Sequence, residues 1–131
     1  MNVEVFGVEV ELDETAVAES PAEIRRQVAA YERGDLTAFD LTVTVPEGLT
    51  GDVMDRMRRI PYGETRTYGD VAAELDTAAV AVGQACGRNP VPLVVPCHRI
   101  VGSDSLGGFS AGGERALDLK ARLLAHERAS P

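Results

Sequence analysis

The segment 88–100 constrains this chain of 131 residues more than any other, because three prolines occur in it within seven positions. Each proline fixes its own φ and drives the residue before it toward extended backbone. The pattern predicts a stiff apolar stretch from Val91 to Val95 that presents Cys97, with His98 and Arg99 directly after it. Cysteine reacts as a thiolate, and an adjacent histidine or cation raises the thiolate fraction near neutral pH. The segment is therefore typical of a fixed nucleophile, although an apolar setting is also typical of an inert buried cysteine.

Length and cysteine content limit the class of protein. A chain of this size suits one domain, or one domain with a small appendage. The two cysteines, Cys86 and Cys97, make no disulfide framework and fit a reducing cytosol. The first residues lack the pattern of a secretory signal, and no apolar run is long enough to span a bilayer. We expect a cytoplasmic protein without membrane association.

The formal net charge of −8 at first argues against a nucleic-acid partner. The acidic excess, however, is concentrated in the first 55 residues, whereas the remainder is mildly basic. The basic residues of that remainder are arginines except for Lys120, the only lysine in the chain. A nucleic-acid partner is compatible with this distribution. We expect contacts other than ion pairs to contribute more than usual, so that binding depends less steeply on salt.

The first 46 residues predict a small α/β segment. Valines alternate with acidic residues on both sides of Gly7, which indicates a β-hairpin. Ser20, Pro21 and Glu23 form the start signal of a helix with a capping box, and Gly34 ends that helix. Leu41–Val45 alternates as a strand would. We assign this segment a packing role only.

Residues 47–131 predict a mostly helical domain. Two short helices, over residues 68–75 and 78–87, joined by a tight turn indicate a helix-turn-helix. The second helix carries small side chains, of which only Gln84 could reach base edges. Two interpretations of that helix remain open, close approach to a duplex or burial in the core.

A loop rich in Gly and Ser, residues 102–113, is typical of a pocket wall or lid. The closing helix, residues 114–128, should turn Leu117, Ala121 and Leu124 inward. His126 on this helix is expected at the surface, and Cys86 is expected to pack beside the pocket.

Several motifs together carry a resemblance to a known family. They are Ile-Pro-Tyr-Gly-Glu-Thr (60–65), Thr-Tyr-Gly-Asp-Val-Ala (67–72), Asn-Pro (89–90), Pro-Cys-His-Arg-Ile-Val (96–101), Gly-Gly-Phe-Ser (107–110) and Leu-Leu-Ala-His-Glu (123–127). The chain from about 47 to 128 resembles the O6-alkylguanine-DNA alkyltransferases, the methylated-DNA–protein-cysteine methyltransferases. This resemblance implies an α+β fold, with a winged-helix-like alkyltransferase domain over 47–131 preceded by the reduced segment 1–46.

The resemblance also implies a role for each motif residue. Cys97 would accept the alkyl group once and irreversibly, after His98 removes its proton through a bridging water molecule, and Glu127 would orient the imidazole. Asn89 would tie the helix-turn-helix to the active-site segment, and Tyr68 would protonate the flipped guanine. The implied substrate-binding residues are Val95, Phe109, Ser110 and Cys86. The implied DNA-binding residues are Thr67, Tyr68, Gly69, Ala78, Val80, Ala81, Gln84, Arg88, Arg99 and Ser103.

The implied partner is double-stranded DNA containing O6-alkylguanine, with O4-alkylthymine as a further substrate. A monomer would bind it in the minor groove with little sequence preference, and no cofactor or metal is expected. Two positions depart from the family pattern: Val80 stands where an arginine is usual, and Phe109 where a tyrosine is usual. Two alternatives stay open. One is a non-catalytic lesion-binding protein of the alkyltransferase-like group, which lacks the acceptor cysteine; the other is a Cys-His hydrolase.

Overall fold

An antiparallel hairpin begins the fold in the computed structural model, which describes residues 1–109 and 111–129. Strand β1 (Asn2–Val5) pairs with β2 (Val8–Glu11). The two valines of each strand are buried on one face of the hairpin. The turn residues Phe6 and Gly7 have φ values of 49° and 77°, as a tight two-residue hairpin turn requires. The predicted hairpin is confirmed.

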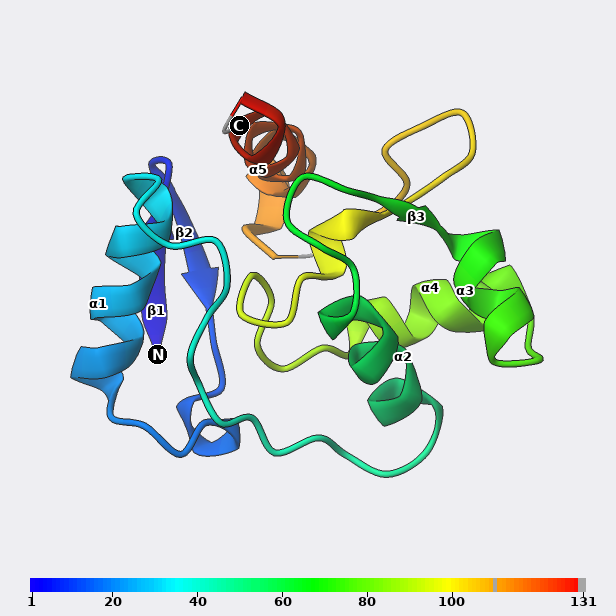
Figure 1. The fold of residues 1–131 in the computed structure, drawn as a ribbon, viewed down its shortest axis with the longest axis horizontal. Helices are drawn as coiled ribbons and strands as arrows, with labels where there is room; N and C mark the ends of the chain where they lie inside the picture. Colours follow the sequence, from blue (N-terminus) through cyan, green and yellow to red (C-terminus); the bar gives the residue numbers. More distant parts are fainter. Residues whose placement is uncertain (110, 130–131) are drawn as a thin grey trace.

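Helix α1 (Pro21–Glu32) packs against β1 (Figure 1). The Ser20 hydroxyl accepts a hydrogen bond from the Glu23 amide at 3.2 Å, as expected of an N-cap. The predicted capping box does not close, because the Glu23 carboxylate instead accepts hydrogen bonds from the side chains of Arg26 and Gln27.

The strand predicted at Leu41–Val45 is wrong. Only one residue of this segment pairs as a strand residue does, Val43 opposite Val17. The segment opposite it, around Val17, offers too few extended residues for a longer ladder, because Val17 follows directly after the 3-10 helix η1 (Glu14–Ala16).

Three helices form the other side of the molecule (Figure 1). Helix α2 (Leu49–Arg58) and helix α3 (Tyr68–Glu74) both pack against α4 (Ala79–Gly87), so the predicted helix-turn-helix is present. A reciprocal pair of hydrogen bonds between Thr67 and Asp70 caps α3. The two-residue strand β3 (Arg66–Thr67) pairs in parallel with β4 (Ile100–Val101), which joins the start of α3 to the segment after the cysteine.

The closing helix α5 (Ala116–Ala129) follows the 3-10 helix η3 (Gly113–Arg115) and packs against η2 (Cys97–Arg99). The predicted inner face of α5 is wrong at two positions, since Leu117 and Ala121 are exposed. The buried face instead carries Ala116, Leu119, Lys120, Leu123, Leu124 and Glu127. It therefore places one lysine and one glutamate in the interior.

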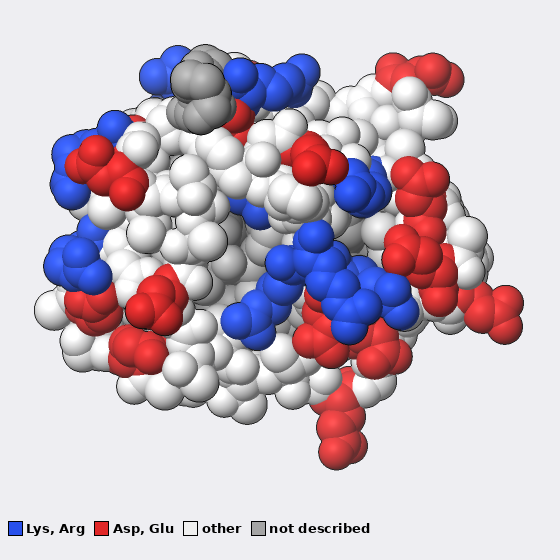
Figure 2. All heavy atoms as spheres, viewed as in Figure 1, with Lys and Arg blue, Asp and Glu red and all other residues white. Residues whose placement is uncertain are grey.

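One hydrophobic cluster includes the valines of the hairpin, Ile24 of α1 and Met54 of α2, so the two predicted segments share a core. The mixed helices and small sheets agree with the predicted α+β class. Over the described residues, no helix is both long and apolar enough to cross a bilayer. Figure 2 shows basic side chains gathered over α2 on the face viewed, with acidic side chains around them.

Candidate active site

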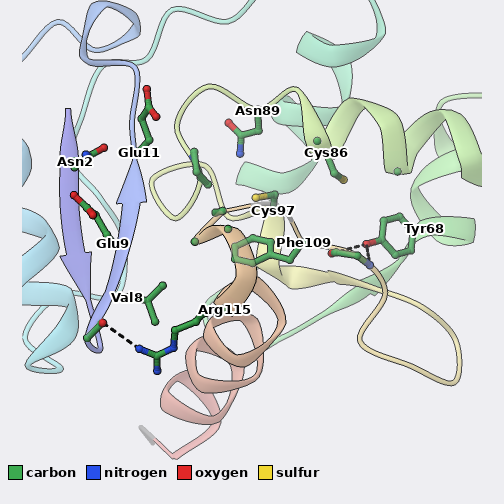
Figure 3. Close-up of a pocket in the computed structure, with 18 of the residues that line it drawn as sticks. Asn2, Val8, Glu9, Glu11, Tyr68, Cys86, Asn89, Cys97, Phe109 and Arg115 are labelled. Carbon is green, nitrogen blue, oxygen red and sulfur yellow. Dashed lines mark hydrogen bonds between the residues drawn. The ribbon is translucent and has the colours of Figure 1, made fainter.

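A cavity of about 1030 Å³ lies between the hairpin and the helical side of the molecule (Figure 3). Six residues predicted for the site contribute to its wall, namely Tyr68, Val80, Cys86, Asn89, Cys97 and Phe109. The opposite wall comes from the hairpin and was not predicted, and it includes Asn2, Glu9 and Glu11. The cavity thus brings the candidate nucleophile together with residues that are distant in sequence.

The segment that leads to Cys97 is a compact turn. The Val95 amide donates to the Val91 carbonyl at 3.0 Å, and Leu93 takes a positive φ of 76°. The predicted apolar stretch thus folds back on itself, and all residues from Val91 to Ile100 are buried. Asn89 fixes the turn, because its amide nitrogen donates to the Val95 carbonyl at 2.9 Å and its amide oxygen accepts from the Val91 amide at 3.0 Å.

Cys97 lies at the cavity with 5% of its surface exposed. Burial raises the pKa of the Cys97 thiol, and a hydrogen bond from Asn89 and the charge of Lys120 oppose this rise only in part. The resting side chain is therefore a neutral thiol near pH 7, contrary to the expectation of an enlarged thiolate fraction. Such a thiol reacts once a base removes its proton.

His98 is completely buried and is paired with Glu127. Its Nε2 atom lies 2.7 Å from Glu127 Oε2, whereas Nδ1 is buried with no hydrogen-bond partner among the described residues. Burial lowers the pKa of His98, although the Glu127 carboxylate opposes this effect. Burial also acts on Glu127, yet hydrogen bonds from His98 and Arg99 lower the pKa of Glu127 to about 2. An ionised carboxylate only accepts, so Nε2 carries the proton and Nδ1 is the free basic nitrogen.

Arg99 points into the protein. Its guanidinium donates to Glu127 Oε1 at 2.9 Å and Oε2 at 3.1 Å, and to the Ile60 carbonyl at 2.8 Å. It also lies 5.7 Å from the centre of the Tyr62 ring. This placement gives Arg99 a structural role inside the protein, and with 8% of its surface exposed it has little access to a phosphate. The predicted DNA contact of Arg99 stays a prediction.

Tyr68 faces the cavity from the start of α3 (Figure 3). Its hydroxyl lies 3.2 Å from both the amide and the carbonyl of Gly108, on the loop 102–113. Burial raises the pKa of Tyr68, so the hydroxyl stays protonated near neutral pH. A protonated phenol at the cavity can donate a proton or a hydrogen bond to a bound base.

Lys120 is another residue beside the site that sequence reasoning missed. Its ammonium donates to the Ile100 carbonyl at 2.7 Å, to the Gly108 carbonyl at 2.9 Å and to the Tyr68 hydroxyl at 3.4 Å. Burial lowers the pKa of Lys120, and interaction with Cys97 and Cys86 opposes that effect. The sequence signal for it is helical spacing, because Lys120 lies on the same buried face of α5 as Ala116, Leu123 and Glu127.

The remaining substrate-binding candidates have different placements. Val95 is fully buried, and its carbonyl already accepts from both Asn89 Nδ2 and the Cys97 amide. Its predicted contact with a base stays a prediction. Phe109 and Cys86 are half-buried at the cavity, and burial raises the pKa of Cys86 to about 12. Ser110 lies outside the described residues.

Helix α4 has one buried and one exposed face. Val82 and Ala85 are buried, whereas Val80 is 72% exposed at the edge of the cavity. Burial therefore accounts for the small residues of one face, and the predicted close approach to a duplex stays open for the exposed face. The other candidates for DNA contact that are exposed are Gly69, Ala78, Gln84, Arg88 and Ser103, and those that are half-buried are Thr67 and Ala81.

The environment of His126 also differs from expectation. Its Nε2 atom donates to the Tyr31 carbonyl at 2.9 Å, and its ring packs edge-on against Phe6 and Tyr31. His126 thus links α5 to the N-terminal segment. Among the described residues, no cluster of three or more His, Cys, Asp or Glu side chains is suited to hold a metal ion.

Comparison with known families gives one clear match. The model of the 6-O-methylguanine DNA methyltransferase DNA-binding domain matches residues 49–129. A methylated-DNA–protein-cysteine methyltransferase of Methanocaldococcus jannaschii is 50% identical over 84 residues, which cover 64% of this chain and 47% of that protein. One of Methanopyrus kandleri is 41% identical over 111 residues, covering 82% and 81%. The chain spans about half the length of the first relatives it matches.

Solved structures agree with this match. The structure of Mycobacterium tuberculosis OGT in complex with DNA has a TM-score of 0.72 and 37% identity, over 83% of this chain and 68% of that one. The structure of a variant of the M. tuberculosis O6-methylguanine methyltransferase has a TM-score of 0.77 and 28% identity, over 99% and 92%.

Proposed function

We propose that this chain, which belongs to the 6-O-methylguanine DNA methyltransferase family, moves an alkyl group from O6 of guanine in DNA to the sulfur of Cys97. The single observation that carries the proposal is the position of Cys97 at a cavity large enough for a nucleobase. The next residue, His98, is buried and paired with Glu127. The names of the relatives point to the same reaction.

The reaction begins with removal of the thiol proton. Nδ1 of His98 is the acceptor, since Nε2 is held protonated by Glu127. The resulting imidazolium is stabilised by the Glu127 carboxylate, which is the arrangement of nucleophile, base and orienting group found in hydrolytic triads. A water molecule relays the proton from sulfur to the ring.

The thiolate then attacks the alkyl carbon. The sulfur–carbon bond forms as the carbon–oxygen bond to O6 breaks, and the bonding electron pair passes to the guanine ring. Tyr68 donates a proton or a hydrogen bond to the guanine as this negative charge develops. The ammonium of Lys120 then stabilises the negative charge that develops on the Tyr68 oxygen. Water does not hydrolyse the thioether, because a thiolate would have to leave as a poor leaving group, so each molecule reacts once.

Substrate entry requires the damaged nucleotide to leave the duplex. We propose that the exposed face of α4 approaches the minor groove of DNA with little sequence preference, because its small residues offer close contact and only Gln84 offers base readout. Val80 at the cavity edge is an apolar side chain that can take the place of the displaced base.

Mass spectrometry tests the proposal. The chain is incubated with a duplex oligonucleotide containing O6-methylguanine, and both the intact protein and its peptides are weighed. We expect one added methyl group on the peptide that contains Cys97, with loss of the O6-methylguanine in equal amount. Cys97→Ser should abolish transfer, whereas in Cys86→Ser the added methyl group should still be found on the Cys97 peptide.

Two outcomes contradict the proposal and identify the alternatives. Binding of the oligonucleotide without any change in mass indicates a lesion-binding protein without catalysis. Repeated turnover of a thioester or peptide substrate indicates a hydrolase.

A further inference from the structure

We propose that Tyr31, in the N-terminal helix α1, is a positioning residue for the alkyl transfer, because its hydroxyl holds the Glu127 carboxylate that orients His98. The inference rests on the proposed function and deepens it. The sequence predicts only a packing role for the segment 1–46. The inference assigns that segment a part in the reaction.

The contact is direct and fully buried. The Tyr31 hydroxyl donates to Glu127 Oε2 at 2.7 Å, across 96 positions of sequence, and Tyr31 and Glu127 are each 1% exposed. The same oxygen accepts from His98 Nε2 at 2.7 Å. Tyr31 and His98 therefore share one acceptor atom, and a change at either one alters the hydrogen bond of the other.

The protonation states make Tyr31 a hydrogen-bond donor to Glu127. Burial, together with the charge and hydrogen bond of Glu127, raises the pKa of Tyr31, so its hydroxyl stays protonated around neutral pH. The carboxylate stays ionised, since its pKa is lowered to about 2. The Tyr31 hydrogen bond thus partly neutralises the charge that His98 experiences.

Other groups around the pair fix its geometry without replacing Tyr31. Arg99 donates to both carboxylate oxygens, and the Gly63 amide lies 3.5 Å from Oε1. Lys120 acts on His98 by its charge. The Tyr31 ring itself packs against Phe39, Tyr62 and His126. Removing the hydroxyl alone keeps this ring packing and removes only the donor.

The chain offers a matched control in Tyr62. Its hydroxyl is also buried, yet it has no hydrogen-bond partner among the described residues. Tyr31→Phe and Tyr62→Phe therefore delete the same atom from neighbouring rings, and only the first deletes a hydrogen bond to the carboxylate.

The experiment measures two rates as a function of pH in each variant. The first is methyl transfer from the O6-methylguanine duplex. The second is alkylation of Cys97 by iodoacetamide, followed on the Cys97 peptide, which needs no DNA.

For Tyr31→Phe we expect both rates to fall about tenfold, the size expected when a hydrogen bond to a charged group is lost. We also expect the acid limb of each profile to move to higher pH. With one donor fewer, the carboxylate stabilises the His98 imidazolium more strongly, and the neutral base is present only at higher pH. Tyr62→Phe should match the unmodified chain in both respects.

An unmoved acid limb in Tyr31→Phe, or an equal loss of rate in both variants, overturns the positioning role. If the unmodified chain transfers no methyl group, the proposed function fails, and iodoacetamide alkylation still decides the role of Tyr31. If Tyr31→Phe does not fold, proton NMR of the unmodified chain decides it: a Tyr31 hydroxyl proton protected from exchange supports the hydrogen bond, and a rapidly exchanging one overturns it.

Discussion

The Nζ atom of Lys120 lies 3.4 Å from the hydroxyl oxygen of Tyr68, and this contact places the only lysine of the chain beside the proposed proton donor. The two residues come from α5 and α3, which are far apart in sequence. Lys120 also interacts electrostatically with both cysteines, Cys97 and Cys86.

Lys120→Met should therefore slow methyl transfer by roughly a hundredfold, the scale of one donor that stabilises developing charge. It should also raise the pKa of Cys97 further, because a positive charge that favours the thiolate is lost. The rate and its pH dependence are measured by transfer to Cys97 and by iodoacetamide alkylation. Arg122→Met, an exposed charge on the same helix, is the control and should change neither. An unchanged rate in Lys120→Met contradicts the assigned role.

Gly107 leaves room for Tyr68. Its φ is +74°, and a Cβ atom at this position would lie 2.5 Å from Tyr68 Cε2 and 2.7 Å from the hydroxyl oxygen. Gly107→Ala should therefore displace the tyrosine and slow methyl transfer by about tenfold or more, without loss of the overall fold. Gly108→Ala, where a Cβ atom meets nothing within 4 Å, is the matched control and should retain the full rate. Single-turnover kinetics with circular dichroism separate the two effects, and equal rates in both variants would count against the placement of Tyr68.

Arg99 should stabilise the fold and make no contribution to DNA binding. Arg99→Met leaves a buried carboxylate short of its donors, so we expect the melting temperature to fall on the order of 10 °C. The dependence of DNA affinity on salt should not change. Arg88→Met, at an exposed position after α4, should instead reduce that salt slope by about one ion and leave the melting temperature unchanged. A reduced slope in Arg99→Met would support the sequence-based assignment.

Val80 should limit repair of duplex DNA. Its side chain is apolar and 72% exposed at the cavity edge, so it fills a vacated base position less well than a long charged side chain. Val80→Arg should speed methyl transfer on duplex substrate by roughly tenfold, since unstacking a base costs a few kcal/mol. Single-stranded substrate, in which little stacking is lost, should react at the same rate with both chains. Equal acceleration on both substrates contradicts this explanation.

Local sequence signals predicted most of the fold. The valine alternation of the hairpin, the Ser20-Pro21 start of α1 and the Thr67 cap of α3 each depend on neighbours within a few residues. The prediction of a strand at Leu41–Val45 was wrong because a strand needs a neighbouring strand to pair with, and alternation of side chains does not show whether one is present. The inner face of α5 failed because apolar spacing alone placed Leu117 and Ala121 inward, whereas the fold buries charged Lys120 and Glu127.

The site was predictable only where the motifs carry it. Cys97, His98 and Glu127 follow from the resemblance, but the burial of Arg99 and the hydroxyl of Tyr31 do not. Both depend on partners at least 28 positions away in sequence, at the same carboxylate. Burial also reverses the expected state of Cys97, because an adjacent histidine in the sequence says nothing of how dry the surroundings are.

The position of Lys120 has a consequence for how the protein can be handled. Because the chain has no other lysine and this one is fully buried, amine-directed reagents find no side-chain target on the folded surface. Acylation of Lys120 would report opening of the interior around α5, and its rate would give a direct readout of how often the molecule exposes that region to solvent.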